Sequence, residues 1–186
     1  MQILSPKTAP KAPLHLTEMD TAVGSLYLLS DAEALLYTGF ADPRGPESRV
    51  PALLRRWISS ASDRDFLPST DELQQRAREE LRLYFQGQLR GFSVPAKLYG
   101  TPFQQELWRE LTKVSYGSTV SYGDLARRLA RPGASRAVGS AVGSNPLSIF
   151  VPCHRVLPHS GRVGNYGGGP WRKEKLLALE GVQAHL

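Results

Sequence analysis

The sequence pattern permits a small α/β domain followed by a mostly helical domain that contains a helix-turn-helix, the architecture that a family resemblance described below implies. Short runs rich in Thr, Val, Tyr and Leu over residues 14–40 are typical of strands. Residues 69–86 then place apolar side chains at helical spacing. Over residues 121–144, a glycine-containing turn joins two short helical stretches, a pattern shared by the helix-turn-helix and the ordinary helical hairpin.

The first domain begins with a stretch rich in Pro, Lys and Ala, residues 1–13, which predicts a loose tail. Two or three strands follow over 14–40, with Gly24 and a turn around Asp31 between them. The prolines and glycine of residues 41–47 predict a loop, and residues 50–58 are a candidate helix.

A longer helix is expected from Ser69 to about Gln86. Ser69 with Glu72 three residues later has the pattern of a capping box. Apolar side chains at helical spacing should bury one face of this helix in the core. They are Leu73, Ala77, Leu81 and the Tyr84–Phe85 pair.

The second domain is expected to follow a linker over residues 87–100, which are irregular and contain three glycines. The predicted domains are thus residues 1–92 and 101–186. Thr101 before Pro102 is a signal for the start of a helix, with threonine as the N-cap. The buried stripe of this helix is expected to be Phe103, Leu107, Trp108 and Leu111.

The helix-turn-helix candidate starts at Ser121, which can cap the first helix, with Asp124 near the positive end of the helix dipole. The second helix is expected over residues 135–144, and every residue in it except Arg136 is small or β-branched. Such a slim helix can pack closely against protein or enter the minor groove of DNA. This segment alone favours packing.

Composition is that of an ordinary globular protein, since 41% of the 186 residues are apolar and 22% are charged. No apolar run approaches the ~20 residues that span a bilayer. The N-terminus has no long apolar stretch before a small-residue cleavage site, so no signal peptide is predicted. We therefore expect a cytoplasmic protein that does not bind membranes.

Positive charge is concentrated in the second half of the chain. Residues 1–100 hold 12 basic and 12 acidic side chains, whereas residues 101–186 hold 11 basic and 5 acidic ones, a net charge of +6. A compact basic segment is typical of a nucleic-acid-binding surface, and also of a merely solvated one.

The chain has a single cysteine, Cys153, which excludes an intrachain disulfide and argues against a cysteine-based zinc site. We expect no metal and no cofactor. A free cysteine is more often buried and inert than reactive, so its neighbours must decide. An apolar, strand-like run over residues 149–151 leads to it, and an imidazole and a guanidinium follow it, a setting that favours a depressed thiol pKa.

The stretch Pro152-Cys153-His154-Arg155-Val156 resembles the active-site motif of the O6-alkylguanine-DNA alkyltransferases. Other motifs of this family are matched in the same order, over residues 101–181 in all, and residues 21–26 match loosely. These other motifs are Ser121-Tyr122-Gly123, Arg136-Ala137-Val138-Gly139, Asn145-Pro146, Gly161-Arg162-Val163-Gly164-Asn165-Tyr166, Lys173-Glu174-Lys175-Leu176-Leu177 and Glu180-Gly181.

The resemblance implies a ribonuclease-H-like first domain and DNA repair by direct reversal of damage. Family members transfer an alkyl group, such as methyl, from O6-alkylguanine in double-stranded DNA to the cysteine; O4-alkylthymine is a second candidate substrate. A polarisable thiolate suits in-line displacement at an sp3 carbon, and the resulting thioether does not hydrolyse, so each molecule acts once. We expect a monomer that flips the lesion out of the duplex from the minor-groove side.

The resemblance also implies a role for each catalytic residue. Cys153 is the nucleophile and His154 the base that takes its proton. Consecutive residues of an extended segment point to opposite sides, so a water is expected to bridge these two side chains. Glu180 would orient His154, Tyr122 would donate a proton to the departing guanine, and Asn145 would brace the turn before the active-site strand.

DNA contacts are assigned, by the same resemblance, to the second helix of the helix-turn-helix. Arg136 would fill the gap left by the flipped nucleotide. The other expected DNA-contacting residues are Tyr122, Ser135, Ala137 and Gly139. The expected substrate pocket comprises Val142, Pro152, Val163, Gly164, Asn165, Tyr166, Gly167, Gly168 and Lys173.

One departure from the family lies at Gly167, where relatives often carry a serine whose hydroxyl can hydrogen-bond O6. Here only a backbone group is present, so we expect activity to survive with an altered rate or altered preference among alkyl groups.

Two alternative functions are compatible with parts of the sequence. An alkyltransferase-like protein would bind the lesion without repairing it, but such proteins typically replace the cysteine, commonly with tryptophan. An unrelated hydrolase using Cys153, His154 and Glu180 would turn over many times and would not need a basic, slim helix.

Overall fold

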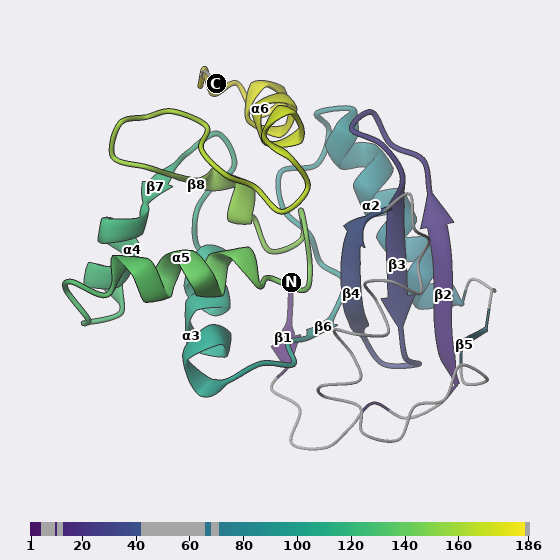
Figure 1. Ribbon diagram of the computed structural model, residues 1–186. Coiled ribbons are helices and arrows are strands. Elements are labelled where there is room, and N and C mark those ends of the chain that lie inside the picture. The colour runs from purple at the N-terminus through teal and green to yellow at the C-terminus, as the bar shows by residue number, and fades with distance from the viewer. Residues whose placement is uncertain (5–9, 11–12, 42–65, 68–70, 185–186) are drawn as a thin grey trace. The chain divides into compact units, whose positions relative to one another are not determined.

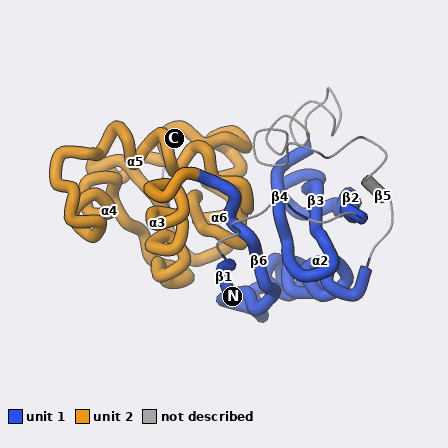
Figure 2. Tube along the Cα trace, turned by 90° about the horizontal axis from the view of Figure 1, so that it is seen from below, with its two compact units in different colours: residues 1–100 blue, residues 101–186 orange. Residues whose placement is uncertain are grey.

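The chain forms two compact units, residues 1–100 and 101–186, as the computed structural model shows (Figure 2). The first unit is α/β and the second is mostly helical, as the sequence predicts. The residues described are 1–4, 10, 13–41, 66–67 and 71–184.

The first unit is built on a sheet whose strand order is β1-β6-β4-β3-β2-β5 (Figure 1). Three antiparallel strands form its centre, and they confirm the strands predicted over residues 14–40. The turn at Asp31 is also confirmed, because its Oδ1 accepts the backbone N–H groups of Glu33 and Ala34 at 3.0 and 2.9 Å. The strands are β1 (Ile3–Leu4), β2 (Leu14–Met19), β3 (Leu26–Ser30), β4 (Leu35–Phe40), β5 (Phe66–Leu67) and β6 (Ala96–Lys97).

Two predictions for this unit are wrong. The expected loose tail contributes β1, and the expected linker contributes β6. These short strands pair in parallel with each other, and β6 also pairs with β4, so the free edge of the central sheet supplies backbone partners that local sequence does not reveal. The helix expected over residues 50–58 and most of the loop expected over 41–47 lie outside the described residues. The likeness to ribonuclease H stays a prediction.

Helix α2 (Glu72–Phe85) begins later than expected. Asp71 is its N-cap, and the Asp71 carboxylate accepts the backbone N–H of Gln74 at 2.7 Å. The prediction of a capping box that starts at Ser69 is therefore wrong, because Asp71, directly before the first turn, already satisfies one of the backbone N–H groups at the helix start. Ser69 lies outside the described residues. The buried residues of α2 are Gln74, Ala77, Leu81 and Tyr84, whereas Leu73 and Phe85 are only partly buried.

The second unit contains helices and one two-stranded parallel sheet, β7 with β8 (Figure 1). Both predicted helix starts are confirmed, because Thr101 and Ser121 each form a capping box. The elements are α3 (Pro102–Leu111), β7 (Val120–Ser121), α4 (Tyr122–Arg128), α5 (Ser135–Gly143), a 3-10 helix η3 (Cys153–Arg155), β8 (Val156–Leu157) and α6 (Pro170–Leu179).

Helix α5 packs against α3 and α4 with one face and is exposed on the other. Trp108 of α3 is buried and donates its indole N–H to the carbonyl of Ala141 at 2.9 Å, which fixes the two helices together. The buried residues of α5 are Val138, Ala141 and Val142. Its exposed residues include Arg136, Ala137, Ser140 and Gly143, so the outward face is slim and carries one cation. In the described part of the chain, no helix has the length and apolarity to cross a bilayer.

Candidate active site

Cys153 lies at the start of η3, after a turn rather than a strand. The apolar run over residues 149–151 was expected to be extended, but Ile149 has a φ of 74° and residues 149–150 form a turn. The side chain of Asn145 supplies the partners that a neighbouring strand would have given. It donates to the carbonyl of Val151 at 2.8 Å and accepts the N–H of Leu147 at 3.0 Å.

The thiol of Cys153 is buried and held by polar neighbours. Asn145 Nδ2 lies 3.0 Å from Cys153 Sγ, a contact that the sequence did not predict. Burial raises the pKa of the Cys153 thiol. Hydrogen bonds from Asn145 and Tyr166 and the charge of Lys173 oppose that rise because they stabilise the thiolate.

Lys173, on α6, carries the charge that lowers the pKa of this thiol. Its side chain is 1% exposed, and Nζ donates to the carbonyl of Val156 at 2.7 Å. Burial lowers the pKa of Lys173 to about 8, and a negative charge on Cys153 raises it. The thiolate and the ammonium therefore support each other's charged forms.

The imidazole of His154 is buried and contacts Glu180, as the family resemblance implies. Nε2 lies 2.9 Å from Glu180 Oε1, and because an ionised carboxylate only accepts, Nε2 carries the proton. The other nitrogen, Nδ1, is then an acceptor, and it has no hydrogen-bond partner among the described residues. Burial lowers the pKa of His154, as do the charges of Arg155 and Lys173, while Glu180 raises it.

Glu180 is the C-cap of α6. Its carboxylate accepts hydrogen bonds from three residues outside this helix, His154, Arg155 and Gly117. Arg155 donates to both carboxylate oxygens, with Nε–Oε2 at 2.8 Å and Nη2–Oε1 at 2.9 Å. The backbone N–H of Gly117 donates to Oε2 at 3.2 Å. The guanidinium explains how a carboxylate is stable at the negative end of a helix dipole without solvent.

The structure corrects three expectations about these residues. The pKa of the Cys153 thiol was expected to be depressed, but burial raises it. The guanidinium of Arg155 was expected to act on the thiol, but the structure pairs it with Glu180. Cys153 and His154 were expected in an extended segment, but both lie in a 3-10 helix, because the N–H of Arg155 bonds the carbonyl of Pro152 at 3.0 Å. Arg155 and Gly117 were not predicted from the sequence as partners of Glu180. An acidic residue at the negative end of a helix dipole could have indicated that a cation lies beside it.

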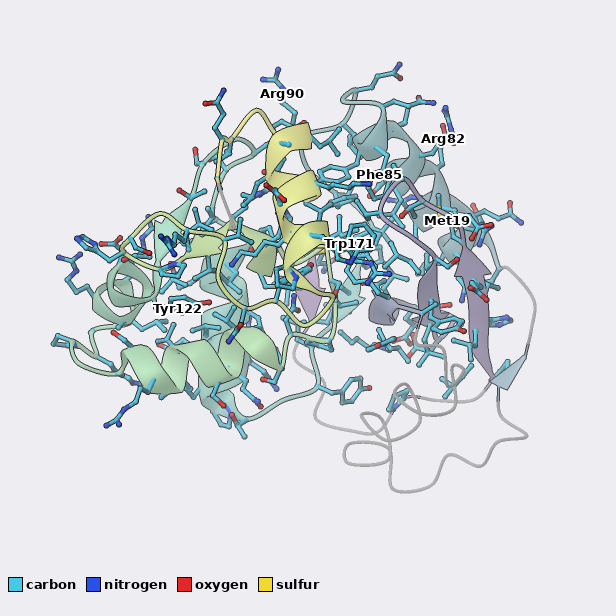
Figure 3. All side chains as sticks on the ribbon, turned by 45° about the horizontal axis from the view of Figure 1, so that its top comes forward. Met19, Arg82, Phe85, Arg90, Tyr122 and Trp171 are labelled. Carbon is cyan, nitrogen blue, oxygen red and sulfur yellow. The ribbon has the colours of Figure 1, made fainter. Side chains whose placement is uncertain are left out.

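Tyr122 is the first residue of α4, and its ring faces α5 (Figure 3). A Cβ atom on Gly139 would lie 3.8 Å from this ring, so that glycine lets the two helices pack closely. Burial raises the pKa of the Tyr122 phenol, and a charge on Cys153 raises it further. Tyr122 therefore keeps its proton and lies within electrostatic reach of the thiol.

The remaining predicted residues fall into two groups. Ser135, Arg136 and Ala137 are exposed at the start of α5, and Asn165 and Gly167 are exposed in the loop before α6. Val142, Pro152 and Val163 are buried. The Val163 side chain packs with Leu157, Leu177 and Ala184, so only its backbone remains to line a pocket. The structure also ties Gly168 to α6, since Arg172 donates to its carbonyl at 2.6 Å.

Comparison with known proteins places the chain in a family. A family model described as 6-O-methylguanine DNA methyltransferase, DNA binding domain, matches residues 102–182. A methylated-DNA–protein-cysteine methyltransferase of Haemophilus influenzae is 39% identical over 170 residues, which cover 91% of this chain and 87% of that protein. The chain belongs to the methylated-DNA–protein-cysteine methyltransferase family.

Other members of the methyltransferase family agree with this assignment. One from Mycolicibacterium paratuberculosis is 51% identical over 104 residues, 56% of this chain, and the match spans 63% of that relative's length. The crystal structure of Mycobacterium tuberculosis OGT in complex with DNA matches with a TM-score of 0.75 and 36% identity, covering 90% of this chain and 93% of that one. Among the residues described here, no three His, Cys, Asp or Glu side chains gather as they would around a metal ion.

Proposed function

We propose that this protein repairs DNA by moving an alkyl group, such as methyl, from O6 of guanine in duplex DNA to Cys153 in one irreversible event. The observation that carries the proposal is that a buried thiol in contact with Asn145 is followed directly in the chain by a buried imidazole in contact with Glu180. Asn145 contacts Sγ at 3.0 Å, and the neighbouring His154 is oriented by Glu180 at 2.9 Å. These contacts support the assignment of Cys153 as nucleophile, His154 as base and Glu180 as the group that orients the base.

The thiol proton would leave through His154. Its Nδ1 is the free acceptor of the ring, and we propose that a bridging water carries the proton from Sγ to it. Burial favours the neutral thiol of Cys153 and the neutral imidazole of His154. The thiol proton would therefore leave while the sulfur attacks the alkyl carbon. The S–C bond forms and the C–O6 bond breaks. Tyr122 gives the departing guanine a proton and is then reprotonated, so the thiol proton ends, in net terms, on guanine.

DNA would be bound by α4 and α5 acting as a helix-turn-helix. The exposed face of α5 is slim enough to approach a minor groove, and Arg136 projects from its first turn. We propose that Arg136 occupies the gap left by the flipped nucleotide, with Ser135 and Ala137 beside it and Gly139 behind, against Tyr122.

The lesion base would enter above the thiol, between Tyr122 and the loop before α6. Tyr166 and the charge of Lys173 lower the pKa of Cys153 and so stabilise its thiolate. We propose that the backbone of Gly164 and Gly167 reads the base edge. The remaining expected pocket residues are Val142, Pro152, Val163, Asn165 and Gly168. All these groups come from residues 101–186, so we propose that one copy of the second unit suffices and that the protein acts as a monomer.

Intact-mass measurement tests the proposal. Mixing the protein with duplex DNA that carries O6-methylguanine should add one methyl group, on Cys153, and no more with excess DNA. Cys153→Ser should still bind this DNA without gaining mass. Repeated demethylation without a mass gain would instead identify a Cys-His hydrolase. Tight binding by the wild type with no transfer would identify a lesion-binding protein.

A further inference from the structure

The turn at residues 116–117, between α3 and β7, contacts the last residues of α6. The phenol of Tyr116 donates to the backbone carbonyl of Leu179 at 2.9 Å. The next backbone N–H, that of Gly117, donates to Glu180 Oε2 at 3.2 Å. Two consecutive residues of the turn thus hold two consecutive residues at the end of the helix, and the second of these is the residue that contacts the proposed base.

We propose that Tyr116 and Gly117 are positioning residues of the alkyl transfer, which act on His154 by fixing the Glu180 carboxylate. The proposal rests on the function proposed above, because it gives these two residues a part in that reaction. Neither residue carries a charge at neutral pH, so the effect of the turn comes from where it holds the carboxylate.

Tyr116 holds the backbone on which the carboxylate is carried. The last carbonyls of an α-helix have no partner within the helix. Leu179 is the last residue of α6, and its carbonyl accepts the hydrogen bond from the Tyr116 phenol. Because Glu180 follows Leu179 directly, loss of this bond should loosen the position of the carboxylate. The ring of Tyr116 also lies 5.9 Å from the guanidinium of Arg155, which pairs with the same carboxylate.

Gly117 suits this place in its conformation and in its surroundings. Its φ is 73°, in the left-handed region that favours glycine. A Cβ atom here would lie 3.0 Å from the backbone carbonyl oxygen of Glu180, and a main-chain atom at a helix end cannot easily move aside. The absence of a side chain therefore lets the turn approach closely enough for its N–H to reach the carboxylate.

The carboxylate connects this turn to the imidazole. Glu180 Oε2 accepts from Gly117, while Oε1 lies 2.9 Å from His154 Nε2. The charge of Glu180 raises the pKa of His154, whereas burial and the charges of Arg155 and Lys173 lower it. A displaced carboxylate would support the imidazolium less, so His154 would become a weaker base.

The pH dependence of single-turnover methyl transfer tests the role in the reaction. Tyr116→Phe removes the phenol oxygen and keeps the ring. We expect slower transfer, with the fall in rate at low pH displaced to lower pH than in the wild type, because a less basic imidazole stays neutral to lower pH. A variant that was merely less stable would lose activity at higher pH instead. A displacement in that direction, or none, would overturn the proposal.

The matched control for the phenol is Thr112→Val. Thr112 is the C-cap of α3, and its hydroxyl donates to the carbonyl of Arg109 at 2.8 Å, so this change also removes a hydroxyl bonded at a helix end. It should keep the pH profile of the wild type.

Gly117→Ala tests the second contact, since the added Cβ should push the turn away from Glu180. We expect the pH profile to move in the same direction as in Tyr116→Phe. The control is Gly87→Ala, at a glycine whose φ is 71° and whose Cβ would meet nothing within 4 Å, so the backbone strain is similar and the contact is absent. Identical profiles for the two alanine variants would exclude a part for Gly117.

A proton NMR measurement tests the positioning without any transfer. In protein with isotope-labelled histidine, the Nε2 proton of His154 can be assigned by its loss in His154→Gln. We expect this proton to exchange with water about fivefold faster in Tyr116→Phe, the factor that one hydrogen bond of ordinary strength is worth. Exchange as slow as in Thr112→Val would contradict the positioning role. Faster exchange in a protein whose wild type gains no methyl group would support the positioning and contradict the proposed function.

Discussion

Arg155 and Glu180 form a bidentate ion pair inside the second unit, with side chains 7% and 0% exposed. The same carboxylate contacts His154, so one buried group links the proposed base to the stability of the fold. We expect Glu180→Gln to lower the free energy of unfolding by about 3 kcal/mol, because it leaves a buried guanidinium uncompensated. Urea unfolding measures this loss.

The control for this prediction is Glu79→Gln. Glu79 also pairs with an arginine, Arg82, but that pair is exposed to solvent. Screening by water leaves such pairs with little effect on stability. A similar loss in both variants would contradict the idea that burial makes the Glu180 carboxylate important.

A pH dependence of stability follows from His154. Burial lowers the pKa of this group from its ordinary 6.5, so below that pH the unfolded chain binds a proton that the folded chain does not. His154 therefore contributes full stability above pH 6.5, and this contribution is lost as the pH falls, by up to about 1.4 kcal/mol per pH unit. We expect His154→Gln to flatten the pH dependence of unfolding in this window. His159→Gln, a change at an exposed histidine, should leave it as in the wild type.

Because the chain has one cysteine, the titration of Cys153 can be followed directly by thiolate absorbance. The charge of Lys173 lowers the pKa of this thiol, so Lys173→Met should move the titration midpoint to higher pH. Lys175→Met is the matched control, since Lys175 is exposed on the same helix. A midpoint that stays in place for Lys173→Met would show that the ammonium does not act on the sulfur.

The parts of the fold that the sequence predicts correctly are those with local causes. The starts of α3 and α4 depend on caps, Thr101 and Ser121, within three residues of the groups they satisfy. The strands β1 and β6 have no such local cause. They are two residues long, and partners about 90 residues apart in the chain hold them together.

The residues of the candidate site also differ in whether the sequence alone could predict them. Cys153 and His154 could be proposed as site residues because the motif places them side by side, and Glu180 because the family resemblance extends to the end of α6. The contacts of Asn145 with Cys153 Sγ and of Arg155 with Glu180 could not be predicted from the sequence, because both depend on how a turn and a 3-10 helix orient the side chains. The adjacency of Arg155 to Cys153 was misleading for the same reason.

The exposed end of α5 gives a prediction about DNA approach. A Cβ atom on Gly143 would meet nothing within 4 Å, so Gly143→Ala should raise the free energy of unfolding by up to ~1 kcal/mol through helix propensity. If this face enters a minor groove, the added methyl group should weaken DNA binding in the same variant. Gly91→Ala, which also adds a methyl group in open space, should leave DNA affinity unchanged. Unaltered binding by Gly143→Ala would show that DNA does not approach this end of α5.

Gly167, where relatives of the family often carry serine, permits a test of pocket chemistry. A Cβ atom there would also meet nothing within 4 Å, and the backbone is not left-handed, so Gly167→Ser should fold with stability within about 0.5 kcal/mol of the wild type. If the loop faces O6 of the flipped base, the new hydroxyl can donate to the oxygen as it leaves, and single-turnover transfer of methyl should become several-fold faster. Gly167→Ala fills the same space without a donor and should give no acceleration. Equal rates for Ser and Ala would mean that residue 167 does not reach O6, and that the altered residue has no part in leaving-group chemistry.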